Sequence, residues 1–171
     1  MKLGRVNIFE SAHVRGRKFG TKGSIHNKEW EVIANAIVKY NIKNVLEFGS
    51  GFSTKLFFDA GLKVTSMETN ENWAKVVRKE VPHAKIIVWD NKEFPDYVNG
   101  YYDLSLVDGA WPRIEQLKQA MQRSNRLFIH DVNRQDELDL IQGHLTGWKA
   151  YNWQNNPEFT KERLAFFEKS V

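Results

Sequence analysis

A glycine-rich bend and a downstream acid are the features of this 171-residue sequence whose spacing indicates chemistry. One apolar run ends in EFGSG at residues 47–51, and its two glycines let the backbone approach a ligand closely. A second apolar run ends at Glu68, 19 residues after Gly49. Doubly wound folds bind a ribose hydroxyl with a carboxylate at about this distance from the bend. An ordinary strand-to-helix turn explains the glycines alone, but the bend and the acid together predict a ligand site.

The elements that hold these residues follow from the spacing of the apolar side chains. Apolar runs predict strands at 44–48, 62–68, 84–89, 101–107, 126–129, 148–153 and 164–168. Helical spacing predicts helices near 29–40, 53–60, 71–81, 112–123 and 138–145. Strands that alternate with helices form a parallel sheet, whereas the last two strands have no helix between them. We therefore expect one α/β domain over residues 1–171, with a mostly parallel doubly wound sheet and an antiparallel hairpin at one edge.

The predicted helices also have expected faces and caps. The first helix should bury one face, formed by Trp30, Ile33, Ala34, Ile37 and Val38. Ser53 or Thr54 is expected to cap the second helix, and Asn70 is expected to cap the third. The third helix carries three apolar residues, which are Trp73, Val76 and Val77.

Composition restricts the kind of protein. The content is 42% hydrophobic and 13% aromatic, which fits a packed globule. No run approaches the roughly 20 apolar residues of a membrane span, and the start lacks the apolar middle of a signal peptide, so a cytoplasmic location is expected. The sequence has no cysteine, which excludes disulfides, thiolate metal sites and cysteine nucleophiles.

The net charge of +4 comes from an N-terminal arm. Residues 1–28 hold seven Lys and Arg side chains against one acid. Such a segment can bind phosphates of a nucleic acid through residues 2–28, and it is expected to pack on or near the ligand site. A solvated arm is the alternative.

These features together resemble the class I S-adenosylmethionine-dependent methyltransferases. The resemblance rests on residues 47–51, on Glu68, Asp90 and Asp108, and on the two closing strands. It covers most of the chain from about residue 25. The small-molecule O-methyltransferase-like subgroup is nearest, because Val107-Asp108-Gly109 is followed by Arg113 and the fifth strand ends in Ile129-His130-Asp131. Dinucleotide-binding domains are the alternative, but Thr54 stands where their third glycine would be.

The resemblance implies the strand order 3-2-1-4-5-7-6, with strand seven antiparallel and helices on both faces. It also implies contacts with S-adenosylmethionine. Gly49, Ser50 and Gly51 would line the methionine part of the cofactor, and Glu47 would fix that loop or meet the amino group. Ser53 and Thr54 would offer hydrogen-bond donors near the carboxylate, at the start of a helix.

The remaining cofactor contacts implied by the resemblance lie at the next two strand ends. Glu68 would accept hydrogen bonds from both ribose hydroxyls. Asp90 would face the adenine amino group, with Trp89 or Trp73 against the ring. A turn-capping role for Asp90 and a core role for Trp73 are the alternatives.

Methyl transfer requires an aligned acceptor and, for many acceptors, a base that removes a proton. The candidates follow strands four and five, at the edge where parallel strands open onto a shared crevice: Asp108, His130 and Asp131. Asp108 is the first choice for contact with the reacting zone, and His130 is the base best tuned to neutral pH, with a structural role as its alternative. Arg113 would bind an anionic acceptor or pair with Glu115 or Asp131.

Some related methyltransferases hold Mg²⁺ with acids at these two strand ends and an amide directly after the second. Here Val132 follows Asp131, and Asn133 comes one place late. The ligand set is therefore incomplete, and we expect no catalytic metal.

The acceptor is predicted to be a small molecule, with oxygen as the expected acceptor atom. Cytosine C5 chemistry needs a cysteine, and this sequence has none. Base-amino methyltransferases resemble one another in a Pro-Pro-aromatic motif, whereas Asp108-Gly109-Ala110-Trp111-Pro112 stands at that place. An RNA acceptor bound through the basic arm is one alternative, and an inactive binding module with the same fold is another. The sequence does not predict the oligomeric state.

Overall fold

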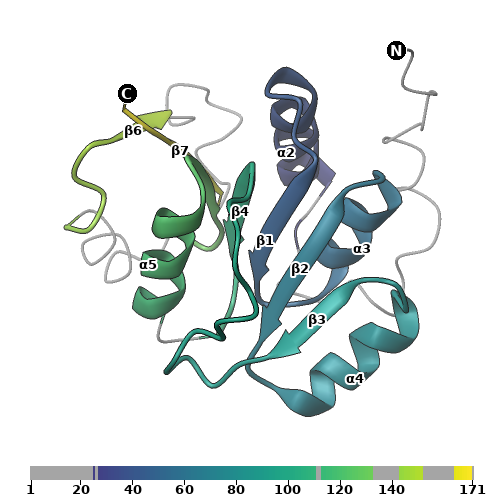
Figure 1. The fold of residues 1–171 in the computed structure, drawn as a ribbon. Coiled ribbons are helices and arrows are strands. Elements are labelled where there is room, and N and C mark those ends of the chain that lie inside the picture. Colours follow the sequence, from purple (N-terminus) through teal and green to yellow (C-terminus); the bar gives the residue numbers. More distant parts are fainter. Residues whose placement is uncertain (1–24, 26, 111–112, 133–142, 152–163, 171) are drawn as a thin grey trace.

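The computed structural model describes residues 25, 27–110, 113–132, 143–151 and 164–170 (Figure 1). The helices in this part of the chain are α2 (Asn27–Lys39), α3 (Phe52–Asp59), α4 (Glu71–Glu80) and α5 (Ile114–Arg123). The strands are β1 (Asn44–Phe48), β2 (Lys63–Glu68), β3 (Lys85–Val88), β4 (Leu104–Val107), β5 (Arg126–Ile129), β6 (Trp148–Tyr151) and β7 (Ala165–Lys169).

Among the described residues, seven strands form one sheet in the order β3-β2-β1-β4-β5-β7-β6. Strands β1 to β5 run parallel, and β7 is antiparallel to both β5 and β6. The predicted α/β architecture and strand order are therefore confirmed. From β1 the chain first builds the sheet to one side, through β2 and β3, and then to the other side, through β4 and β5. The carboxyl end of β1 is therefore a topological switch point, where open α/β sheets bind ligands.

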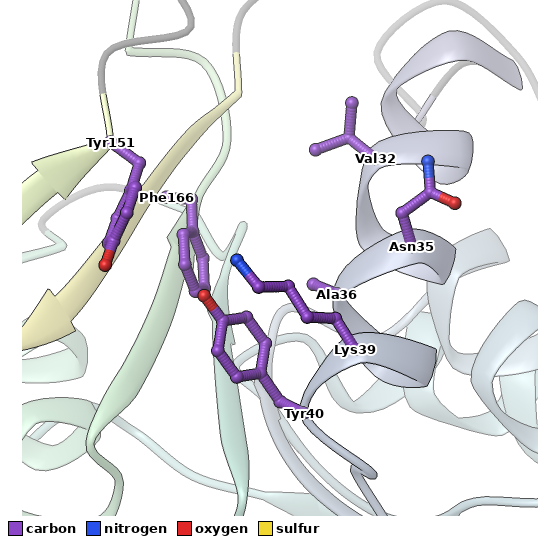
Figure 2. A pocket seen from close by; sticks show the side chains of 7 residues that line it. All are labelled: Val32, Asn35, Ala36, Lys39, Tyr40, Tyr151 and Phe166. Atoms are coloured by element: carbon purple, nitrogen blue, oxygen red, sulfur yellow. The ribbon is translucent and has the colours of Figure 1, made fainter.

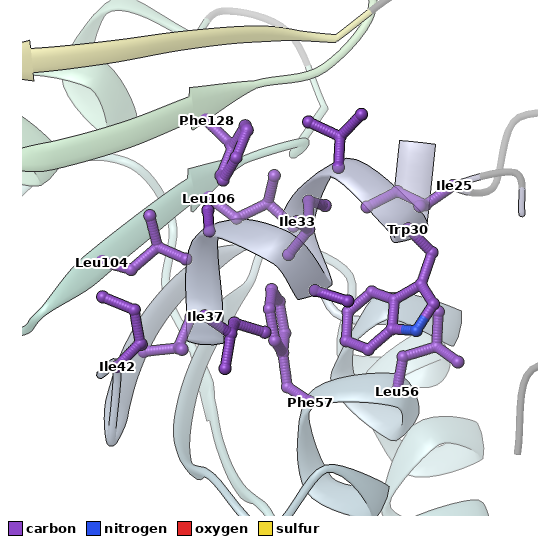
Figure 3. Packing of buried hydrophobic residues seen from close by; sticks show 14 of the residues in the cluster. Ile25, Trp30, Ile33, Ile37, Ile42, Leu56, Phe57, Leu104, Leu106 and Phe128 are labelled. Carbon is purple, nitrogen blue, oxygen red and sulfur yellow. The ribbon is translucent and has the colours of Figure 1, made fainter. Parts of the chain in front are cut away.

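Apolar side chains alternate between the two faces of the sheet. One buried cluster joins Val45, Leu104, Leu106 and Phe128 to α2 and α3 (Figure 3). The other joins the neighbouring strand residues, such as Leu46 and Leu127, to Leu117 of α5. Both faces are covered, which explains why the strands are apolar runs rather than alternating patterns.

The buried face of α2 differs from the predicted one. Val38 is 71% exposed, so its predicted place in the core is wrong, whereas Trp30, Ile33, Ala34 and Ile37 are buried as predicted. Val32 and Ala36 are buried instead, because α2 also packs toward β7, where Phe166 joins the same cluster. The buried stripe of α2 is therefore rotated toward the β6–β7 hairpin.

The other helix predictions have mixed outcomes. Asn70 caps α4 by accepting a hydrogen bond from the Trp73 N–H at 3.0 Å, as predicted. Trp73 and Val76 are 39% and 42% exposed, so the core role that was the alternative for Trp73 is not observed, whereas Val77 is buried. Gly51, and neither Ser53 nor Thr54, is the N-cap of α3.

Several predictions lie outside the described residues. These are residues 1–24 of the basic arm, Pro112, most of the predicted helix at 138–145, and the last two residues of the strand predicted at 148–153. In the described parts of the chain, none of the helices has the length and apolar character needed to cross a membrane.

Candidate active site at the carboxyl edge of the sheet

The bend after β1 packs tightly against the end of β4. Gly49 has a φ of +94°, and its N–H donates to the Met67 carbonyl at 2.8 Å. A Cβ atom at Gly49 would lie 2.6 Å from the Asp108 carbonyl oxygen, so only glycine fits here. A Cβ atom at Gly51 would meet nothing within 4 Å. The bend is therefore closed toward β4 at Gly49 and open at Gly51.

Glu68, at the end of β2, holds the bend from the other side. Its Oε2 accepts hydrogen bonds from the Ser50 N–H at 2.9 Å and from the Ser50 Oγ at 2.8 Å, and its Oε1 accepts one from the Asn70 N–H at 2.8 Å. The side chain is buried, with 7% exposure of the residue. The predicted closeness of this acid to the glycine bend is therefore observed. A carboxylate has about four acceptor positions, so these three bonds leave room for a further donor.

Trp73 lies against the same bend. Its indole Nε1 donates to the Ser50 carbonyl at 2.6 Å, while the residue stays 39% exposed. This places an accessible aromatic ring beside the bend. Trp89 differs, because it is buried and packs its ring against Phe48 and Phe94. Between the two tryptophans predicted for the adenine ring, the structure leaves only Trp73 accessible.

Asp90 follows β3 and has a largely exposed side chain. Its Oδ1 accepts a hydrogen bond from the Lys92 N–H at 3.1 Å, and its Oδ2 lies 3.5 Å from the Lys92 ammonium. This is the turn-capping role that was the alternative for Asp90. Contact with adenine stays a prediction.

Glu47, near the end of β1, is fully buried below the bend. The hydroxyls of Ser53 and Thr54 donate to its Oε1 and Oε2, each at 2.5 Å, and the Gly51 N–H donates to Thr54 Oγ1 at 2.8 Å. Burial raises the pKa of Glu47 to about 7, against the lowering effect of the hydrogen bonds from Ser53 and Thr54. The hydroxyls of Ser53 and Thr54 therefore donate to Glu47, and not to the ligand site for which they were predicted as donors.

Asp108 and His130 follow β4 and β5 on the face of the sheet that α2 covers. Nδ1 of His130 lies 2.8 Å from Asp108 Oδ1, and Nε2 lies 3.2 Å and 3.3 Å from the two carboxylate oxygens of Glu29. Burial lowers the pKa of His130, but the hydrogen bonds and charges of Asp108 and Glu29 outweigh it and raise the pKa to about 9. The ring is therefore a cation at neutral pH that donates to a carboxylate on each side.

This geometry favours a positioning role for His130 over the predicted role as base. The residue has 0% exposure, and both ring nitrogens are occupied by carboxylates. Of the two carboxylates bound to the ring, Asp108 is the more accessible, with a side chain that is 15% exposed against 2% for Glu29. Its Oδ1 binds His130, and none of the described residues donates to its Oδ2.

Arg113 ties the loop after β4 to the end of β5. Its Nε donates to the Gly109 carbonyl at 2.8 Å, and one terminal nitrogen donates to the His130 carbonyl at 2.6 Å. The other terminal nitrogen lies 3.9 Å from Asp108 Oδ1 and 3.8 Å from Asp131 Oδ2. Of the predicted roles, pairing with Asp131 is observed. Glu115 pairs with Lys118 instead. Contact of Arg113 with an anionic acceptor stays a prediction.

Asp108, His130 and Asp131 place possible metal ligand atoms within 4.8 Å of one another. The group does not fit a divalent cation, because both nitrogens of His130 donate to carboxylates and Arg113 already lies against both acids. Protonated imidazole has no lone pair for a metal. The expected absence of a catalytic metal stays a prediction, now with this physical reason.

Sequence reasoning missed two buried residues of this region, Glu29 and Gln116. Glu29 lies four residues before Ile33 and eight before Ile37, so it continues the buried stripe of α2, and that spacing is a usable signal. Gln116 is 1% exposed, donates to the Ala110 carbonyl at 2.9 Å and packs on Gly109. Nothing in the sequence marks Gln116.

A cavity of about 320 Å³ lies elsewhere, between α2 and the β6–β7 hairpin (Figure 2). Val32, Ala36 and Phe166 form its apolar part, and Lys39 and Tyr151 are among its polar lining residues. The hydroxyl of Tyr151 donates to Glu168 Oε2 at 2.9 Å. None of the predicted site residues lines this cavity, so the candidate active site is the carboxyl edge of the sheet.

No protein-family model and no curated protein matches this sequence. Solved structures do match. A methyltransferase from Podospora anserina with bound S-adenosylhomocysteine has a TM-score of 0.69 at 14% identity, covering 97% of this chain and 87% of that one. The O-methyltransferase TomG from Streptomyces achromogenes, solved with S-adenosylmethionine and involved in tomaymycin synthesis, has a TM-score of 0.64 at 13% identity, covering 100% and 92%. A Pyrococcus horikoshii protein provisionally assigned as an RNA methyltransferase has a TM-score of 0.66 at 15% identity, covering 99% and 100%.

These likenesses establish the fold, which is that of the class I S-adenosylmethionine-dependent methyltransferases. The predicted resemblance is confirmed at that level. Two of these similar structures hold the cofactor or its product.

Proposed function

We propose that this protein transfers the methyl group of S-adenosylmethionine to a small molecule that bears a hydroxyl group. The observation that carries the proposal is the Glu68–Ser50 contact at the topological switch point of the sheet. It joins a buried acid to a glycine bend that is open at Gly51, at the edge where this fold class binds ligands.

The residues present fit the cofactor. Glu68 retains an acceptor position for a ribose hydroxyl, and Trp73 offers an accessible ring next to it. The space beside Gly51 suits the methionine part. Glu68 has no ion pair among the described residues, so this buried acid also suits a ligand that carries a positive sulfonium. The bound cofactor supplies an activated methyl group.

The chain's own residues orient and receive the acceptor. Asp108 Oδ2 lies at the end of β4, next to the Gly49 bend, and accepts no hydrogen bond from the described part of the chain. A carboxylate there accepts a hydrogen bond from a hydroxyl and takes its proton as the methyl is transferred. The Asp108 carboxylate repels anionic acceptors. Arg113, the nearby cation that could offset this repulsion, donates to the carbonyls of Gly109 and His130. We therefore propose a neutral, proton-bearing acceptor.

RNA is the second candidate acceptor, and one sequence observation favours it. Residues 1–28 carry seven cationic side chains, and a segment of that charge binds phosphates. Salt-sensitive RNA binding that is lost when residues 1–22 are deleted would support this candidate over a small molecule.

Calorimetric titration with S-adenosylhomocysteine tests the cofactor site. Glu68→Ala should weaken binding about fivefold to 150-fold, which corresponds to the roughly 1–3 kcal/mol lost when buried polar partners are removed. Glu71→Ala is the matched control, because Glu71 is an exposed acid three residues further on. The affinity of this variant for S-adenosylhomocysteine should equal that of the unmodified protein. Equal affinities of both variants, or no binding by the unmodified protein, would contradict the proposal. Transfer of a tritiated methyl group to a panel of phenols and alcohols, with total RNA as a parallel acceptor, then separates the two acceptor classes.

A further inference from the structure

Glu29 is a buried acid with no role in the proposed cofactor site or in the acceptor contact. It lies in the first turn of α2, and its side chain is 2% exposed. Burying a carboxylate is costly unless a cation pairs with it. The imidazole of His130 supplies that cation, at 3.2 Å and 3.3 Å from the two oxygens of Glu29.

The contacts of Glu29 lead directly to the accessible carboxylate of Asp108. The His130 ring lies between Glu29 on α2 and Asp108 at the end of β4, with 2.8 Å between Nδ1 and Asp108 Oδ1. Because each ring nitrogen has its own carboxylate, the ring cannot rotate without losing hydrogen bonds. The ring thus fixes which oxygen of Asp108 is bound and which is free.

Other charged groups face the same ring. Asp131 Oδ1 lies 3.7 Å from Nδ1 and is the competing carboxylate. Arg113 binds the backbone carbonyl of His130 and approaches Asp108 and Asp131. The charge of Glu47 on β1 also acts on Asp108. Without the charge of Glu29 the pKa of the His130 ring should fall, so that the ring loses its second proton more easily and Asp131 competes with Asp108 for Nδ1.

We propose that Glu29 is a positioning residue for methyl transfer, which acts through His130 to hold Asp108 with Oδ1 bound and Oδ2 directed to the acceptor. The inference rests on the proposed function, since it assigns the accessible oxygen of Asp108 to the acceptor side. It adds a residue of the first described helix to a site otherwise built from strand ends.

The test compares Glu29→Gln with Glu31→Gln. The first change keeps a hydrogen-bond acceptor but removes the charge, and the second removes an exposed acid from the same helix. Nitrogen NMR of histidine-labelled protein at pH 8 reads the two ring nitrogens of His130. We expect both to be protonated in the unmodified protein and in Glu31→Gln. In Glu29→Gln the ring should be neutral, because the pKa of His130 falls from about 9 toward 6.5.

Two further measurements on the same samples connect the ring to the reaction. The affinity for S-adenosylhomocysteine should be equal in all three proteins, because Glu29 does not contact the glycine bend. Methyl transfer at pH 8 to the best phenol or alcohol of the panel should fall about tenfold in Glu29→Gln alone, with no change in the KM for S-adenosylmethionine.

The outcomes separate the inference from the proposed function. A neutral His130 ring in the unmodified protein at pH 8 overturns the inference without any variant, as does a Glu29→Gln ring that stays doubly protonated. An unchanged transfer rate in Glu29→Gln also overturns it. If the unmodified protein does not bind S-adenosylhomocysteine, the proposed function fails, and the NMR result still reports whether Glu29 controls the ring.

Discussion

Raising the pH from 6.5 to above 9 should destabilise the folded protein, because it removes a proton that His130 holds between two carboxylates. The pKa of His130 is about 9 in the folded protein, against 6.5 for an ordinary histidine. A raised pKa means that the stabilisation is complete below pH 6.5 and is lost as the pH rises through about 9. The difference is about 2.5 pH units at about 1.4 kcal/mol each, which gives about 3.5 kcal/mol for the complete titration, of which about 3 kcal/mol falls between pH 6.5 and 9.5.

Urea unfolding at a series of pH values measures this loss directly. The unmodified protein should lose about 3 kcal/mol of unfolding free energy between pH 6.5 and 9.5. His130→Gln should be less stable at pH 6.5 and should show little further loss over the same interval, because glutamine does not titrate. A flat profile for the unmodified protein, or an equal slope in both proteins, would refute the assignment of a buried imidazolium.

Three further predictions concern the bend, its buried acid and the metal question. Gly49→Ala should destabilise the fold by about 3 kcal/mol or more, because the new side chain would sit at a positive φ and clash with the backbone of Asp108. Gly51→Ala should leave the melting temperature unchanged and weaken S-adenosylhomocysteine binding. The reverse pattern would contradict the open space at Gly51. The pKa of Glu47 is raised from 4.5 to about 7, so the unfolding free energy should fall as the pH rises from 4.5 through 7, by about 3 kcal/mol at most. Glu47→Gln should flatten the urea-unfolding profile in that interval. Methyl transfer should be unchanged after dialysis against EDTA, because Arg113 and His130 neutralise the acids that a metal would need, and activity restored only by Mg²⁺ would show the opposite.

The mostly parallel sheet with an antiparallel edge could be predicted because each strand is an apolar run and most are separated by helices, whereas the strand order was implied by the resemblance to the methyltransferases. The bounds of β1 and β5 agree with the predicted 44–48 and 126–129. The predicted strand at 101–107 begins later, at Leu104, because Tyr102 makes only an isolated bridge to Ser124. The apolar character of a segment predicts that it is buried. Whether it also pairs as a strand depends on a neighbouring strand that the local sequence does not show.

The face of α2 could be predicted only in part. Helical spacing identifies Ile33 and Ile37, but it gives equal weight to Val38 and to Val32. The β6–β7 hairpin decides between them, because Val32 faces the hairpin across the cavity of Figure 2 and belongs to the same buried cluster as Phe166. This cluster joins segments more than a hundred residues apart, so no local pattern contains it.

The candidate site shows the same limit. The spacing of Gly49 and Glu68 predicted that this acid and the bend lie together, because both are fixed by the ends of adjacent parallel strands. The pairing of Glu29 with His130 spans 101 residues and could not be predicted. The hydroxyls of Ser53 and Thr54 bind Glu47 because a buried carboxylate without a cation needs donors, an effect that depends on burial rather than on sequence spacing.

A crystal structure of the protein with S-adenosylhomocysteine tests the central claim most directly. The proposal predicts the ribose of the ligand at Glu68, its homocysteine part in the space beside Gly51, and its sulfur on the side of Asp108 Oδ2. Ligand density at another place on the molecule, or a Glu68 carboxylate that makes no contact with the bound nucleoside, would contradict it.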